Sequence, residues 1–187
     1  MPGCQPILPD CADDVSRIFI KSDRMYQHHI LRINYTTYDV RRSQDVINPG
    51  TSHRDIMMLA NNASDDEGVE KVHPFCYARI LGIYHVNVIY TGTGMVDYVA
   101  HRLNFLWVRW YQYSKAQSIG WRDYQLDMLH FLPMAHEHAF GFVDPQDVIR
   151  AGHILPAFKR GKSHADGISI SRCAGDGADW QNYFVNR

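Results

Sequence analysis

The sequence predicts a mainly β domain, either a small antiparallel β-barrel or a bent sheet, with one short helical turn near residues 145–150. The first observation is the stretch 74–113, where two long runs are rich in Val, Ile, Tyr, Phe and Trp, residue types that favour a pleated, half-buried surface. The second is that shorter strand-like runs flank this stretch on both sides. The third is that the sequence lacks alternating strands and long amphipathic helices, which argues against an α/β fold.

The two long runs, PFCYARILGIYHVNVIY and RLNFLWVRWYQY, are joined by TGTGMVDYVAH. In the second run the even positions 104–110 fall on one face of a strand and the odd positions 103–111 on the other. Both faces are largely apolar, which is typical of a strand in the middle of a sheet. We therefore expect these runs to be the central strands of the domain.

Before the central pair, residues 1–15 carry three prolines and little periodicity, so we expect a flexible lead-in followed by one domain at 16–187 with its core at about 54–158. SRIFIKSDRMYQHHILRINYTTYDV is interpreted as two strands with a turn near residues 21–24. RRSQDVINPGTSHRD is interpreted as a loop, with turn chemistry at 48–50. IMMLA predicts a short buried strand, and NNASDDEGVEK predicts an exposed acidic loop.

After the central pair, YSKAQSIGWRDYQ predicts a polar loop and QLDMLHFLP a strand. In the segment that follows, Asp144 suits the cap of a helical turn, Pro145 its first position and Asp147 its third. We expect this turn to end at 150–152 and a strand to begin at His153. FKRGKSHADG then predicts a basic loop, and DWQNYFVNR is strand-like.

Composition narrows the functional classes. The net charge of -1 gives no global basic field of the kind that marks many nucleic-acid-binding proteins, although HRLNFLWVRW and FKRGKSH are locally basic. The four cysteines form no Cys-x-x-Cys pair, which indicates reduced thiols in an intracellular protein. There is no charged-then-apolar leader and no apolar run long enough to span a membrane, so we expect a soluble protein without a membrane partner.

The eleven histidines raise the alternative of a metal-dependent enzyme. The tightest group is His130 with His136 and His138, and in an extended segment the last two project to the same side, where both can reach one divalent ion such as zinc. The competing interpretation is a solvated polar loop, because spacing identifies no third ligand. No motif for nucleophilic catalysis or for a phosphate-binding loop is recognisable.

Aromatic residues on the central strands are the stronger indication. A subset at the rim of a barrel would form a cage for a methylated lysine through cation–π contacts. The aromatic candidates are Tyr84, Trp110, Tyr111 and Tyr113. Basic residues near them or later in the chain would contact phosphates or an acidic partner. The basic candidates are Arg109, Lys159, Arg160 and Lys162. The competing interpretations are core packing for the rings and a solvated surface for the charges.

Five stretches are distinctive in combination: LRINYTTYDVRRSQDVINP, HPFCYARILGIYHVNV, LNFLWVRWYQ, HAFGFVDPQDVIRAGHILPAF and DWQNYFVNR. Together they resemble a domain of uncharacterised proteins from mushroom-forming fungi that is associated with transposable elements. Members of that family usually carry an aromatic residue at the position of Cys76 and acidic or polar residues near 136–138. They also continue past the position of Arg187, which implies a truncated or degenerate copy here.

A second resemblance covers residues 56–158. The order YARILGIYHVNV, LNFLWVRWYQY, VDPQDVIRAGHILPAF is similar to the SH3-like barrel of the bromo-adjacent homology (BAH) domain. In that family, a strand of the Ala-Arg-Ile type precedes a Val-x-Trp-aromatic strand, and a helical turn then leads to a further strand. The matching residues here are 78–80, 108–111 and 152–155. This resemblance implies a chromatin or protein-interaction module without a cofactor.

The leading functional prediction is thus a non-enzymatic module, derived from a mobile element, that binds a nuclear protein, a histone tail or DNA. The nucleus is the favoured location within the cell. The alternatives are the metal-dependent enzyme and a purely structural accessory domain of a transposase complex. The sequence contains no motif that specifies an oligomeric state.

Overall fold

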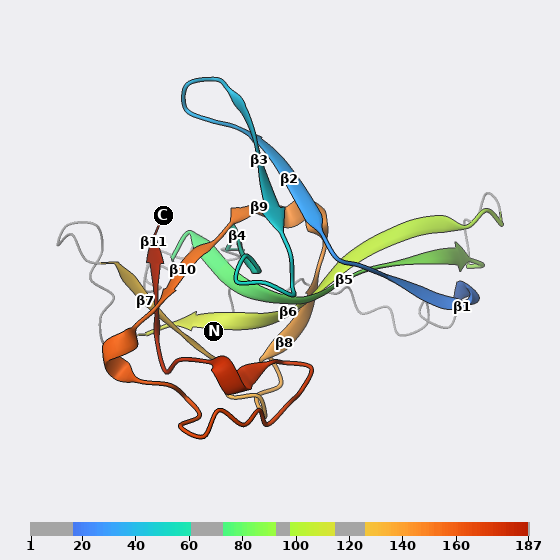
Figure 1. The fold of residues 1–187 in the computed structure, drawn as a ribbon. Coiled ribbons are helices and arrows are strands. Elements are labelled where there is room, and N and C mark those ends of the chain that lie inside the picture. The colour runs from blue at the N-terminus through green and yellow to red at the C-terminus, as the bar shows by residue number, and fades with distance from the viewer. Residues whose placement is uncertain (1–16, 61–72, 93–97, 115–125, 187) are drawn as a thin grey trace, which may run out of the picture.

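The computed structural model describes residues 17–60, 73–92, 98–114 and 126–186. The predicted lead-in at 1–15, the acidic loop at 61–71 and most of the polar loop at 113–125 lie outside these residues. Within them the chain is mainly β, as predicted, and forms a bent antiparallel sheet (Figure 1). The strands and 3-10 turns (η) are β1 (Ile18–His28), β2 (Leu31–Thr36), β3 (Arg42–Ile47), β4 (Asp55–Leu59), β5 (Phe75–Tyr90), β6 (His101–Tyr113), β7 (Asp127–Phe131), β8 (Phe140–Val143), η3 (Pro145–Asp147), β9 (Val148–Ala151), β10 (His153–Pro156), η4 (Phe158–Arg160), η5 (Asp176–Ala178) and β11 (Tyr183–Asn186).

The large sheet has the strand order β10-β11-β7-β6-β5-β4-β9, with β1 also paired to β5 and β8 also paired to β6. It is not a closed barrel, because its two end strands β9 and β10 do not pair with each other in the part of the chain that is described. They are consecutive in sequence, however, and the chain crosses from one end of the order to the other at Gly152. The Gly152 N–H donates to the carbonyl of Asp55 over 2.8 Å, so the bend lies close against β4.

The central pair is β5 and β6, as the sequence predicts, with Ile80 opposite Val108 and Ile83 opposite Leu106. The register shifts between Ile80 and Gly82, which places one extra residue in β5. Such a bulge preserves the inward face across the shift, so Ile80 and Ile83 both lie in the same buried cluster.

The two faces of the central pair contribute to two hydrophobic clusters. The first contains Ile56, Ala78 and Val108, and the second contains Tyr77 and Tyr111. Position 108 belongs to one cluster and position 111 to the other, so the predicted two-faced burial of β6 is confirmed. Buried core residues also occur outside the predicted core range of 54–158. These residues include Ile47, Ala174, Tyr183 and Val185.

The segment before β2 differs from the prediction. The expected turn at 21–24 is a bulge inside β1, where the register with β5 shifts between Ile20 and Met25. Ser22 and Asp23 have positive φ angles of 60° and 49°, the local conformation that a turn would also use. Because β5 pairs with β1 on both sides of the bulge, the chain continues in the same direction to the end of β1 at His28.

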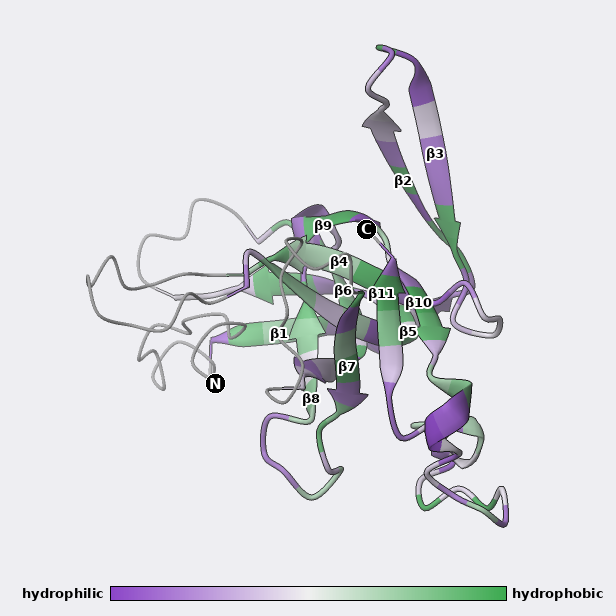
Figure 2. Cartoon of the chain, turned by 90° about the vertical axis from the view of Figure 1, so that its left-hand side faces the viewer, coloured by the Kyte–Doolittle hydropathy of each residue, from purple (hydrophilic) through white to green (hydrophobic). Residues whose placement is uncertain are grey.

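The prediction of a loop at 41–55 is also wrong in its first half, because 42–47 form strand β3. This strand pairs with β2 in a hairpin that projects from the body (Figure 1). Most of β3 is hydrophilic and only its lower end is hydrophobic (Figure 2), so its sequence lacks the apolar alternation of a half-buried strand. The predicted turn at 48–50 is present, since the Thr51 N–H donates to the Asn48 carbonyl over 3.0 Å.

The helical turn predicted near 145–150 is η3. The Asp144 carboxylate accepts a hydrogen bond of 2.8 Å from the Gln146 N–H, and Pro145 occupies the first position. The turn is shorter than predicted, because Val148–Ala151 pair with β4 as strand β9. Among the described residues, no helix has the length and hydropathy needed to cross a membrane.

Candidate functional site

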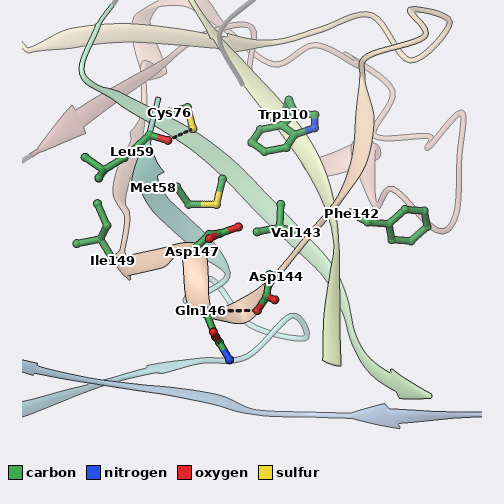
Figure 3. Close-up of a pocket in the computed structure, with 10 residues that line it drawn as sticks. All are labelled: Met58, Leu59, Cys76, Trp110, Phe142, Val143, Asp144, Gln146, Asp147 and Ile149. Carbon is green, nitrogen blue, oxygen red and sulfur yellow. Dashed lines mark hydrogen bonds between the residues drawn. The ribbon is translucent and has the colours of Figure 1, made fainter. Parts of the chain in front are cut away.

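A pocket of about 510 Å³ opens where β4, β5, β6, β8 and η3 meet (Figure 3). Its apolar wall includes Met58, Cys76 and Val143, and the indole of Trp110 forms an aromatic wall. This volume falls in the range of sites that take a small molecule or a single long side chain. The pocket lies on the face of the sheet that carries the first hydrophobic cluster.

Cross-strand pairing and one glycine position the aromatic wall. Trp110 is opposite Ala78 in the β5–β6 register, and its backbone N–H donates to the Ala139 carbonyl over 3.0 Å. A Cβ atom at Gly141 would lie 2.6 Å from the Trp110 Nε1. Glycine at 141 therefore makes room for the indole, and Trp110 is held half-buried at the edge of the pocket.

The polar side of the pocket is acidic. Asp144 lies at the start of η3, where its carboxylate caps the Gln146 N–H. The Asp147 carboxylate points toward Met58 and Val143, whereas the Phe142 ring points away from the other lining residues (Figure 3). No described residue forms a hydrogen bond or ion pair with the Asp147 carboxylate, and the described lining residues include no Lys, Arg or His.

The opposite face of the central pair holds a buried ion network. Asp55, Arg79 and Arg109 lie side by side in the registers of β4, β5 and β6 and are 7%, 5% and 6% exposed. Two arginines directly opposite each other repel. Asp179, which is 3% exposed, bridges them with an ion pair to Arg79 and a 2.5 Å hydrogen bond from Arg109 Nη1.

Two hydroxyl groups complete the network. The Tyr111 hydroxyl donates to Asp55 Oδ1 over 3.0 Å and accepts from Arg79 Nη2 over 3.0 Å. The Tyr183 hydroxyl donates to Asp179 over 3.2 Å. Burial raises the pKa of Asp55, although Arg79 and the Tyr111 hydroxyl act in the opposite direction. Burial and the Asp55 charge raise the pKa of Tyr111 well above its ordinary value.

The ring of Phe131 lies against both guanidinium groups of this network, 4.5 Å from Arg79 and 4.0 Å from Arg109. Because these charges are buried, paired with one another and covered by rings, they do not present a surface to a solute. The network instead ties the segment that contains η5 and β11 to the central strands. We therefore assign it a structural role.

The structure separates the predicted aromatic candidates. Trp110 borders the pocket. Tyr111 is 7% exposed and belongs to the buried network, so it does not lie at a rim. Tyr84 is half-buried and stacks on Phe105 at 5.6 Å, and the Tyr113 hydroxyl contacts the His73 ring. The four rings therefore do not form one cage.

The basic candidates are separated as well. Arg109 is buried and held by Asp179, so it does not face a phosphate. Lys159 and Arg160 are exposed at the end of η4, and the Lys162 Nζ lies 5.9 Å from the centre of the Trp180 ring. This basic turn, defined as 158–162, follows β10 and contributes no residue to the pocket.

The predicted metal-binding histidines lie on two segments. His130 is on β7, opposite Gln112, and burial lowers its pKa. His136 and His138 lie in the turn before β8 with ring centres 5.3 Å apart, and His136 Nδ1 accepts the His138 N–H over 3.1 Å. Among the described residues no three His, Cys, Asp or Glu side chains are gathered to hold a metal ion.

The sequence did not predict the roles of three aspartates, one in the pocket and two in the buried network. Asp147 was recognised only as part of a helical turn, because its place beside Trp110 depends on the pairing of the strands. Asp55 and Asp179 carry no local signal, because Arg79, the partner of both, is 24 and 100 residues away from them in the chain.

Comparison with protein-family models, with curated proteins and with solved structures finds no match to this chain.

Proposed function

We propose that this protein is a non-enzymatic interaction module that binds a cationic side chain of a basic peptide in the pocket beside η3. One observation carries the proposal: among the described residues, the Asp147 carboxylate has no partner and shares an apolar pocket with the Trp110 indole and with no basic side chain. A lysine side chain has the matching chemistry, because its apolar stem can pack on the wall while its ammonium group meets the carboxylate.

Trp110 adds to this preference. Tryptophan is the aromatic side chain that attracts a cation most strongly over its ring face, by about 0.5–2 kcal/mol. Methylation of a lysine keeps the positive charge and makes the head group less hydrated. The expected ligand is therefore a lysine or a methylated lysine, and a histone tail is the favoured source. The resemblance to the BAH domain and to a transposon-associated fungal domain supports a nuclear partner of this kind.

The test is a titration of the full chain with fluorescently labelled, lysine-rich histone-tail peptides, followed by anisotropy. We expect binding of unmodified and trimethylated peptides and none of a peptide in which glutamine replaces each lysine. Asp147→Asn should lower the affinity about tenfold, the usual size of one lost charge-assisted contact. Asp166→Asn, which changes an exposed aspartate outside the pocket, is the matched control. Equal affinities for these two variants would refute the assignment of the pocket.

A further inference from the structure

β1, the outer part of β5 and the first part of β6 extend together from the body as a three-stranded arm (Figure 1). The arm is defined here as 17–29, 83–92 and 98–106. Ten of the eleven residues of β1 are exposed, and β1 has only β5 as a neighbour in the described sheet. The pocket proposed to bind a peptide receives no residue from this arm.

The arm is basic although the whole chain is not. It carries four basic residues, which are Arg17, Lys21, Arg24 and Arg102, and one acidic residue, Asp23. It also contains four histidines. No described carboxylate pairs with Lys21, Arg24 or Arg102. A basic surface without counter-ions of its own is the usual electrostatic feature of a site for phosphate groups.

One face of the arm presents rings. Tyr26 is opposite His85 in the register, and the two rings are nearly parallel, 8° apart with centres at 4.7 Å. His28 Nε2 lies 2.6 Å from His85 Nδ1 while the ring centres are 4.8 Å apart, so these imidazoles meet edge to edge. Tyr26 is 43% exposed, and Phe19 on the same face is 56% exposed.

A guanidinium group is held beside these rings. Arg102 donates from Nε to Asn104 Oδ1 over 2.9 Å, and its Nη2 lies 3.4 Å from His28 Nε2. Asn104 is opposite His85 in the β5–β6 register, so Arg102 approaches the same face as the rings. Its remaining N–H groups have no described carboxylate to bind. A positioned guanidinium next to an exposed ring can contact a phosphate while a base stacks on the ring.

We propose that the ring face of this arm binds single-stranded nucleic acid. Tyr26 provides a stacking surface for a base, and Arg102, with Lys21 and Arg24 from the bulge of β1, binds the phosphates. Single strands fit better than duplexes because the arm offers exposed rings among basic residues, and bases of a single strand are free to stack. This surface and this partner are distinct from those of the peptide pocket.

The test uses the full chain and a fluorescein-labelled oligothymidylate, with anisotropy measured at low and at moderate salt. We expect binding that weakens as salt rises. Tyr26→Ala should weaken it about tenfold through the loss of one stacking contact, whereas Tyr38→Ala, at a tyrosine fully exposed on the β2–β3 hairpin, should not. Lys21→Glu with Arg24→Glu should abolish it at moderate salt.

Lys159→Glu with Lys162→Glu is the control for charge, because it makes the same change on the basic turn. Binding that persists in this variant and is lost in the arm variant supports the proposal. Equal losses in both variants, equal affinity for a duplex of the same length, or no binding at low salt would each overturn it. Circular dichroism of each variant confirms that the sheet is intact before the affinities are compared.

Discussion

Replacing Asp179 with asparagine removes the charge that bridges Arg79 and Arg109 and keeps the shape of the side chain. The carboxylate is 3% exposed and accepts from both arginines and from the Tyr183 hydroxyl. Without it, Arg109 loses its carboxylate partner, while its Nε is already buried with no hydrogen-bond partner among the described residues. Removing one partner of a buried ion pair costs about 3–5 kcal/mol. For a chain of this length the Tm should fall by roughly 6–20 °C.

The free energy of unfolding is measured by urea titration, followed by tryptophan fluorescence, for the wild type and for Asp179→Asn. Asp39→Asn is the matched control, because Asp39 and Arg41 form an ion pair whose side chains are 54% and 84% exposed, and such pairs contribute about 0–1 kcal/mol. If Asp179→Asn and Asp39→Asn destabilise the protein equally, the buried network does not tie β11 to the central strands.

Three further predictions concern pH, packing and metal content. Burial lowers the pKa of His130 below its ordinary value of 6.5, so the unfolded state binds the proton more readily than the folded state. The stability measured by urea titration should therefore fall as the pH drops below 6.5. A His130→Gln variant with an unchanged pH profile would contradict this. Gly141→Ala places a Cβ 2.6 Å from Trp110 Nε1. We expect the free energy of unfolding to fall by about 1–3 kcal/mol through overpacking, and peptide binding to weaken. Wild-type values for both would refute the role of Gly141. Elemental analysis of the purified protein should find no stoichiometric metal, whereas zinc that disappears in a His136→Ala variant would support the metal-dependent alternative.

Local sequence patterns predicted the centre of the fold well. The β-branched and aromatic runs predicted β5 and β6 because both strands are flanked by others and are apolar on both faces. The Asp144–Pro145 pair predicted η3 because capping depends only on neighbouring residues. Strand β3 was missed because a hairpin that projects into solvent needs no apolar alternation. The bulge in β1 was interpreted as a turn because both use the same local conformation.

The candidate site was harder to predict from the sequence than the fold, because only the pairing of the strands brings its residues together. Cys76, Trp110 and Asp147 lie on β5, β6 and η3, and no local pattern relates them. Arg109 was predicted to contact a partner, since an arginine among aromatic residues resembles an exposed binding residue. Its true partner, Asp179, is 70 residues further along the chain, and only the three-dimensional arrangement reveals it.

The most direct test of the proposed peptide pocket is the NMR signal of the Trp110 indole N–H, assigned with a Trp110→Phe variant. Titration with a peptide that contains trimethylated lysine should shift this signal progressively and should shift the backbone amide of Asp147 in parallel. The same peptide with glutamine in place of the lysine should leave both signals in place. Binding of the lysine peptide with neither signal moved would place the peptide elsewhere on the protein and contradict the proposed function.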